Sequence, residues 1–159
     1  MVEEGKAEKT HFESVDEVIE FAIGQEEKAA GFYRGFAEKA TYPGIRKMCL
    51  EMAQEEDRHK EMLLKLQAGV PSGLARERVI DLKISDYLRS FWLDPDADQQ
   101  DLLIAAMKSE SRAERLYLDL AGICDTPEIR DVLLRLAAEE GSHKHAFEKE
   151  YDDRILASN

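Results

Sequence analysis

Two segments of the chain carry the same pair of potential metal ligands, a glutamate followed three residues later by a histidine. The pairs are Glu56 with His59 and Glu140 with His143. On an α-helix, positions i and i+3 lie on one face, so each pair can present a carboxylate and an imidazole to the same point. Oxygen and imidazole donors suit iron and manganese, and zinc can occupy the same set of donors. Both segments are therefore candidate metal-binding helices.

Each pair has a further glutamate earlier in the chain, at a distance that places it beside the pair. Glu26 precedes the first pair and Glu110 precedes the second. In both cases the midpoint between the early glutamate and the glutamate of the pair falls on a predicted turn, at residues 41 and 125. Antiparallel helices joined by a short turn bring residues equidistant from the turn to the same height. We therefore expect each early glutamate to lie beside its pair.

The two halves of the chain are copies of one unit. Residues 17–67 and 101–151 align without a gap at a shift of 84 residues, and fifteen of the 51 positions are identical. The identical pairs include Glu26 with Glu110, Tyr33 with Tyr117, Pro43 with Pro127, Glu56 with Glu140 and His59 with His143. The repeat puts four carboxylates and two imidazoles on one level, and buried carboxylates are costly unless they are neutralised. Two divalent cations would cancel the four negative charges, so a dinuclear metal site is the simplest prediction.

The elements that position these residues are four long helices. Apolar residues recur at helical spacing through residues 18–40, 45–66, 101–124 and 128–151. We expect Ser14 to cap the first helix, with Glu17 completing a capping box. We predict an all-α protein, a closed four-helix bundle of two repeated helical hairpins joined by a long crossover. Its parts are a polar leader at 1–17 and a single bundle at 18–153, with hairpins at 18–68 and 101–153 and the crossover at 69–100. One or two short helical turns are expected near Tyr87–Trp92.

Composition and charge exclude several classes of function. The chain has 159 residues, and its net charge of −12 would repel a nucleic acid or an anionic membrane surface. No stretch of the sequence is long and apolar enough to span a membrane, and the leader lacks the apolar core of a signal peptide, so we expect a cytoplasmic protein. Cys49 and Cys124 are the only cysteines and form no C-x-x-C pair, which excludes a disulfide framework and a four-cysteine metal site.

Some of the candidate residues also have an ordinary structural interpretation. Because 34 residues are acidic, a single Glu-x-x-His can arise on a solvated helix face, but its repetition at matching positions favours ligands. Tyr33 and Tyr117 lie seven residues after the early glutamates and are either hydrogen-bond partners of the ligands or plain core aromatics. Glu55 and Glu139 should point about 100° away from the ligands, which favours surface salt bridges.

Four short motifs together are typical of one family. They are Glu26-Glu27-Lys28-Ala29 leading to Phe32-Tyr33, Glu56-Asp57-Arg58-His59, Glu110 leading to Leu116-Tyr117, and Glu140-Gly141-Ser142-His143. Through them the chain resembles the ferritin-like di-iron carboxylate proteins, and within these the rubrerythrin group. The resemblance covers residues 18–151. It implies a ferritin-like four-helix bundle in up-down-down-up order, in which the second and third helices run parallel and the crossover returns along the bundle.

The resemblance also implies a function. Two iron ions would bind per chain, and the protein would be an oxidoreductase that reduces hydrogen peroxide or dioxygen, in an oxidative-stress or iron-related role. All six ligands would take part: Glu56 and Glu140 bridging the ions, Glu26 and Glu110 as terminal chelators, and His59 and His143 as caps. The alternatives are an iron-binding, storage or sensing module without turnover, and a metal site that only stabilises the fold.

Two departures from the rubrerythrin pattern affect these expectations. Rubrerythrins carry two C-x-x-C pairs in a rubredoxin domain, and this sequence has none, so electrons are expected from a separate rubredoxin or reductase. Rubrerythrins also carry a carboxylate three residues after the ligand of the third helix, where this chain has Ala113. Glu114 is the candidate substitute, although its direction differs by about 100°. We also expect a homodimer.

Overall fold

Four long helices make up most of the protein. The computed structural model describes residues 9–70 and 76–156. The long helices are α1 (Val15–Lys39), α2 (Pro43–Gly69), α4 (Gln99–Ile123) and α5 (Pro127–Tyr151). Shorter pieces are α3 (Arg76–Val79), the 3-10 turn η1 (Ile84–Asp86) and the π-helical turn η2 (Asp152–Leu156). Within the described ranges, no helix is long and apolar enough to cross a membrane. The prediction of an all-α bundle of two helical hairpins is confirmed.

The first long helix, α1, begins directly after its N-cap residue, Ser14. The Ser14 hydroxyl accepts a hydrogen bond of 3.1 Å from the backbone N–H of Glu17, so α1 begins at Val15, three residues before the apolar pattern does. The predicted capping box is only half formed. The Glu17 carboxylate accepts from the backbone N–H of Glu13 instead of that of Ser14, so the reciprocal bond of the box is missing.

The other long helices begin at residues that suit a helix start. Asp98 accepts a hydrogen bond of 2.9 Å from the backbone N–H of Asp101, and the Asp101 carboxylate accepts one of 3.1 Å from the backbone N–H of Asp98. This is a complete capping box at the start of α4. Pro43 and Pro127 occupy the first positions of α2 and α5, where a missing N–H costs nothing and the fixed φ suits a helix.

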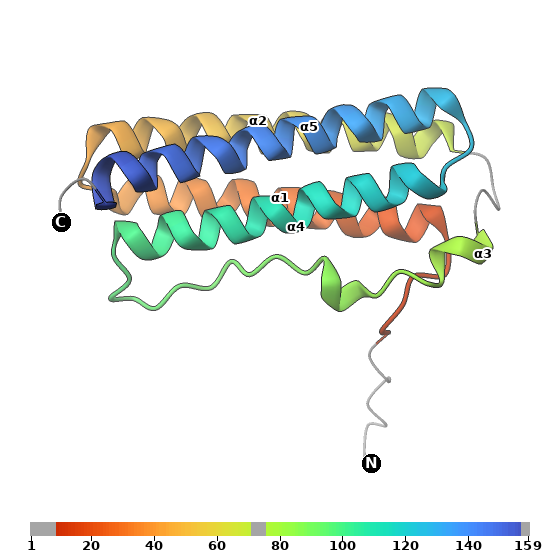
Figure 1. The fold of residues 1–159 in the computed structure, drawn as a ribbon, viewed down its shortest axis with the longest axis horizontal. Helices are drawn as coiled ribbons and strands as arrows, with labels where there is room; N and C mark the ends of the chain where they lie inside the picture. Colours follow the sequence, from red (N-terminus) through yellow and green to blue (C-terminus); the bar gives the residue numbers. More distant parts are fainter. Residues whose placement is uncertain (1–8, 71–75, 157–159) are drawn as a thin grey trace, which may run out of the picture.

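The connection between the hairpins sets the direction of the third long helix. Figure 1 shows it returning along the side of the bundle formed by α1 and α4, away from α2 and α5. Consequently α2 and α4 run parallel, and the order is up-down-down-up, as the resemblance implied. The helical turns of the connection are α3 and η1, so the prediction of turns near Tyr87–Trp92 was wrong in position. At that point the backbone N–H of Arg89 bonds to the side chain of Gln25, which replaces a local turn hydrogen bond.

Two apolar clusters fill the bundle on either side of its mid-height. The first contains Val18, Ile23, Leu63, Ala113, Leu116 and Ala137, among others, and the second contains Ala29, Ile45, Ala53, Leu102, Ala106 and Phe147. On each long helix, the predicted glutamate ligand falls between a residue of the first cluster and a residue of the second. Both cysteines are free and buried within these clusters. The apolar core therefore encloses the level of the ligands from both ends.

Candidate metal centre

The six side chains predicted from the repeat meet at the mid-height of the bundle, in a cluster that we call the cage. The cage consists of Glu26, Glu56, His59, Glu110, Glu140 and His143. Five of these residues have no exposed surface, and His143 is 8% exposed. Two groups of four donor atoms form, and the atoms of each group lie within 4.8 Å of one another: Glu26, Glu56, His59 and Glu140, and Glu56, Glu110, Glu140 and His143. Glu56 and Glu140 belong to both groups, the position that a bridging ligand occupies.

The cage fits a pair of metal ions because five of the atoms that could bind a metal have no hydrogen-bond partner in the part of the chain that the structure describes. Five buried donors have no hydrogen-bond partner among the described residues: Glu26 Oε2, Glu56 Oε1, Glu110 Oε2, Glu140 Oε2 and His143 Nδ1. His143 Nδ1 lies 3.5, 3.6 and 3.7 Å from the unpaired oxygens of Glu56, Glu110 and Glu140. Ligand atoms about 2.1 Å from one divalent ion lie roughly 3.0–3.4 Å apart. Such a set of unpaired buried atoms is what a metal site requires, and it is rare elsewhere in proteins.

Two tyrosines orient the glutamates of the opposite hairpin. Tyr33 on α1 donates a hydrogen bond of 2.6 Å to Glu110 Oε1 on α4, and Tyr117 on α4 donates to Glu26 Oε1 on α1. Both tyrosines are fully buried. Of the two interpretations left open by the sequence, the structure selects hydrogen-bond partners of the cage, although the rings also pack in the core. The two bonds leave the second oxygen of each glutamate free of hydrogen bonds.

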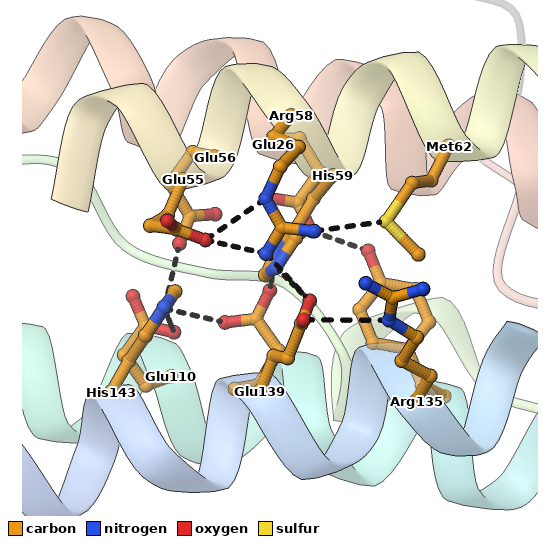
Figure 2. Close-up of polar contacts among 12 residues, drawn as sticks. Glu26, Glu55, Glu56, Arg58, His59, Met62, Glu110, Arg135, Glu139 and His143 are labelled. Carbon is orange, nitrogen blue, oxygen red and sulfur yellow. Dashed lines mark hydrogen bonds and ion pairs between the residues drawn. The ribbon is translucent and has the colours of Figure 1, made fainter. Parts of the chain in front are cut away.

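A charged layer closes the cage between α2 and α5 (Figure 2). Glu139 Oε2 lies 3.0 Å from His59 Nε2 and accepts a hydrogen bond of 2.9 Å from Arg58. Arg58 also donates to Glu55, at 2.5 Å. The expected salt bridges of Glu55 and Glu139 are present, but Glu139 has a second role. Its carboxylate fixes the outer nitrogen of His59 and leaves Nδ1 directed into the cage, where it lies 2.7 Å from Glu140.

Arg89, from the crossover, contacts the cage and was not predicted from the sequence. Its guanidinium is almost completely buried, and Nη1 lies 3.3 Å from Glu56 Oε2 and 3.7 Å from Glu26 Oε2. On the other arm, Nη2 lies 3.3 Å from Glu110 Oε1. One arginine therefore contacts three of the four carboxylates. It reaches them from the α1 and α4 side, since the crossover lies there (Figure 1).

Equivalent positions of the two repeats hold Arg89 in place. Gln25 Oε1 accepts a hydrogen bond of 3.0 Å from its backbone N–H, and Ser109 Oγ accepts one of 2.6 Å from Nε. Gln25 and Ser109 are related by the same shift of 84 residues, and each directly precedes a glutamate of the cage. Both are buried polar residues within apolar helix faces. A polar residue at this position of both repeats indicates that a polar group from elsewhere in the chain is buried against it. The sequence could have suggested the site of Arg89 in this way.

The four carboxylates fall into two pairs with opposite pKa shifts. Burial raises the pKa of Glu26 well above its usual range, and Coulomb repulsion from Glu56 and Glu140 raises it further. Burial and the same two carboxylates also raise the pKa of Glu110. For Glu140, burial acts in the same direction, but its interactions with Glu110 and with the two histidines lower its pKa overall. At Glu56, burial raises the pKa, but the charge of Arg89 and the interactions with Glu26 and His143 outweigh burial and lower the pKa overall.

Both histidines bind protons more readily than a free imidazole. Burial acts to lower their pKa values, but the contacts with carboxylates outweigh it and raise the pKa of His59 and of His143. In the metal-free protein, Glu26, Glu110 and both histidines therefore take up protons at a higher pH than the free groups do, whereas Glu56 and Glu140 are protonated only at a lower pH. A metal ion that binds here has to displace protons from its ligands.

Glu114 does not belong to the cage. Ala113 is buried in the first apolar cluster, and Glu114 is in none of the potential metal-binding groups among the described residues. Its carboxylate lies over Gly141 of α5, so close that a Cβ at position 141 would meet Glu114 Oε2 at 2.2 Å. The glycine accommodates this side chain at the edge of the α4–α5 pair. Neither position 113 nor Glu114 therefore supplies a fifth carboxylate to the cage.

A four-helix bundle in which two helices each supply a glutamate and two others each supply a Glu-x-x-His is the ferritin-like carboxylate class of protein. Within that class, the chain belongs to the rubrerythrin family, whose sequence profile matches residues 17–85 and 101–159. No match was found among curated proteins.

Two solved structures share the fold. One is a protein of Thermotoga maritima described as ferritin-like and di-iron-carboxylate, with a TM-score of 0.72 and 20% sequence identity over 92% of this chain and 99% of that one. The other is a hypothetical protein of Pyrococcus furiosus, with a TM-score of 0.68 and 26% identity over 87% of this chain and 89% of that one. Membership of the rubrerythrin family implies a pair of iron-type ions, and the donor atoms of the cage fit such a pair.

Proposed function

We propose that this protein is a non-haem di-iron oxidoreductase that reduces hydrogen peroxide or dioxygen. The observation that carries the proposal is the set of unpaired, buried donor atoms arranged around two shared carboxylates. Glu26 and His59 would hold one ion and Glu110 and His143 the other, with Glu56 and Glu140 bridging. Iron is the metal we expect, and manganese or zinc could occupy the same donors. When bound, the iron pair supplies electrons to a small oxidant.

The protein contributes orientation and exclusion of water. The Tyr33 and Tyr117 hydroxyls hold the terminal glutamates at one oxygen, and Glu139 holds the outer nitrogen of His59. The two apolar clusters exclude bulk water from both ends of the cage. Because the four carboxylates have no exposed surface, the site favours a small oxidant such as peroxide or dioxygen over a large substrate. Electrons would come from a separate rubredoxin or reductase, and a homodimer stays a prediction.

The first test is metal stoichiometry in variants of the shared carboxylates. Wild-type protein should bind two metal ions per chain, and Glu56→Ala or Glu140→Ala should abolish binding of the pair, because each carboxylate serves both ions. Glu51→Ala is the matched control, since Glu51 lies on α2 and pairs with Lys47 at the surface. Elemental analysis after iron loading measures the result. Unchanged stoichiometry in both cage variants would contradict the assignment.

A second candidate function is iron binding, storage or sensing without turnover. It is favoured by Ala113, which occupies the position where rubrerythrins carry an additional carboxylate, and by Glu114, which lies outside the cage. Peroxide consumption by iron-loaded protein with a chemical reductant separates the two candidates. Turnover that is lost in Glu56→Ala supports the oxidoreductase, while two bound iron ions without turnover support the binding module.

A further inference from the structure

The most unusual feature of the cage is a full positive charge built into it by the protein itself. The Arg89 side chain is 1% exposed, so water does not screen its charge from Glu56, Glu110 and Glu26, which lie 3.3–3.7 Å away. A divalent metal ion in the cage would meet the same carboxylates. The guanidinium and the metal ions therefore compete for one set of negative charges.

The contacts of Arg89 leave no room for a different role. Nε is bonded to Ser109, one arm of the fork faces Glu56 and Glu26, and the other faces Glu110. The guanidinium carbon also lies 5.5 Å from the centre of the Phe91 ring. An external anion would have to displace one of these partners. The geometry is that of a structural cation held by both repeats, and not of an open anion-binding site.

We propose that Arg89 is a resident cation of the cage, which positions three carboxylates in the metal-free protein and weakens the binding of the second metal ion. The inference rests on the proposed metal-binding function. When metal binding has displaced the protons from the cage, its four carboxylates carry a charge of minus four, and Arg89 reduces this to minus three. After one divalent ion has bound, the cage carries minus one instead of minus two, so the second ion is attracted less strongly.

Two effects of Arg89 on metal affinity oppose each other. By holding the carboxylates in place, it reduces the conformational entropy that metal binding has to remove. By its charge, it repels a divalent ion a few ångströms away in a site that excludes water. The free energy of repulsion between full charges at this distance exceeds the free energy that is saved because a few side chains are already ordered. Removal of the charge should therefore strengthen metal binding, although it destabilises the metal-free protein.

The experiment is a titration of metal-free protein with cobalt(II) or zinc(II), combined with thermal unfolding of the metal-free forms. Arg89→Gln removes the charge and keeps a polar side chain. We expect its second metal ion to bind at least tenfold more tightly than in the wild type. We also expect a lower unfolding midpoint for the metal-free variant at pH 7, because three carboxylates lose their counterion.

Two further variants separate the charge of Arg89 from the shape of its guanidinium and from its role in anchoring the crossover. Arg89→Lys keeps the charge but loses the fork, so its second ion should bind as weakly as in the wild type while the metal-free form still melts lower. Arg112→Gln is the matched control. Arg112 anchors the same crossover through the backbone oxygens of Ser85 and Asp86, outside the cage, and its loss should leave both binding constants unchanged.

The outcomes distinguish failure of this inference from failure of the proposed function. If wild-type protein binds two ions and Arg89→Gln binds the second no more tightly, Arg89 only supports the crossover and the inference is overturned. Tighter binding in Arg89→Lys or in Arg112→Gln overturns it as well, because charge would then not be the cause. A wild-type protein that binds neither cobalt nor zinc nor iron overturns the proposed function and the inference with it. Arg89→Lys also provides the test if Arg89→Gln fails to fold.

Discussion

Each terminal glutamate of the cage is held by a tyrosine of the other hairpin. The Tyr33 hydroxyl donates to Glu110 and the Tyr117 hydroxyl donates to Glu26. Because the bond fixes one carboxylate oxygen and leaves the other for the metal, its loss should let the side chain rotate. We expect Tyr33→Phe and Tyr117→Phe each to weaken metal binding by roughly 10- to 100-fold, the usual effect of removing a partner that orients a ligand. Competition titrations with a chelator measure the affinity.

The control for these variants is Tyr87→Phe. The Tyr87 hydroxyl is also engaged, in a hydrogen bond of 2.7 Å to Asp119, but this pair lies outside the cage. Its removal should leave metal affinity unchanged while it costs about 1 kcal/mol of folding free energy. If all three variants bound metal equally well, the cross-hairpin bonds would have no part in metal binding. The tyrosines would then be core aromatics only.

At the scale of elements, the starts of α1 and α4 depend on single capping side chains. Ser14→Ala and Asp98→Ala each remove an acceptor for the N–H groups of a first helical turn. We expect each substitution to lower the free energy of unfolding by about 1 kcal/mol, as measured by urea denaturation. Asp98→Ala should cost more than Ser14→Ala, since the box at α4 is complete and the one at α1 is half formed.

An interior serine provides the comparison for the caps. Ser111 lies within α4 away from both ends, where alanine has the better helix propensity, so Ser111→Ala should change stability by less than about 0.5 kcal/mol. A loss in Ser111→Ala equal to that in Asp98→Ala would mean that the capping bonds contribute nothing. The metal affinity of all three variants should stay unchanged, because none of these residues contacts the cage.

The helices and the meeting of six side chains at one level could be predicted from the sequence, whereas the contacts of the crossover could not. Helical periodicity located the long helices, and the repeat located the six side chains, because both are patterns that recur along the chain. Arg89 belongs to a segment without periodicity, and its position depends on tertiary contacts with Gln25 and Ser109. The helical turn expected near Tyr87 was misplaced for the same reason, since a side chain on α1 binds the backbone there. Glu114 lies outside the cage because its carboxylate packs over Gly141, a contact that the spacing of residues in the sequence does not predict.

For the whole molecule, stability should depend on metal and pH together. Glu26, Glu110 and both histidines have raised pKa values in the metal-free fold, so the folded chain binds more protons than the unfolded chain. Their contribution is present in acid and is lost as pH rises, so metal-free protein should melt lower at pH 8 than at pH 5. The lowered pKa values of Glu56 and Glu140 matter only below about pH 4.5, outside this range.

The metal-loaded protein should show the opposite trend. Metal binding displaces protons, so the affinity and the stabilisation both grow as pH rises, and the two melting curves should converge in acid. Glu26→Gln combined with Glu110→Gln removes the two carboxyls whose pKa values are raised by burial and repulsion, so this variant should melt above metal-free wild type at pH 8. Thermal unfolding between about pH 5 and pH 8 measures all three proteins. Equal melting of the metal-free and loaded forms throughout would mean that the six residues are not a buried metal site.

The short turns within each hairpin have a consequence for the kinetics of folding. Most contacts between helices join neighbours in the chain, α1 with α2 and α4 with α5, whereas the cage forms only where the two hairpins meet. Local contacts form early and pairings distant in sequence form late, so the cage should be largely absent from the folding transition state. Interactions absent from the transition state change the rate of unfolding and leave the rate of folding almost unaltered. The lifetime of the folded chain would then depend on the supply of metal, while the speed at which a new chain folds would not.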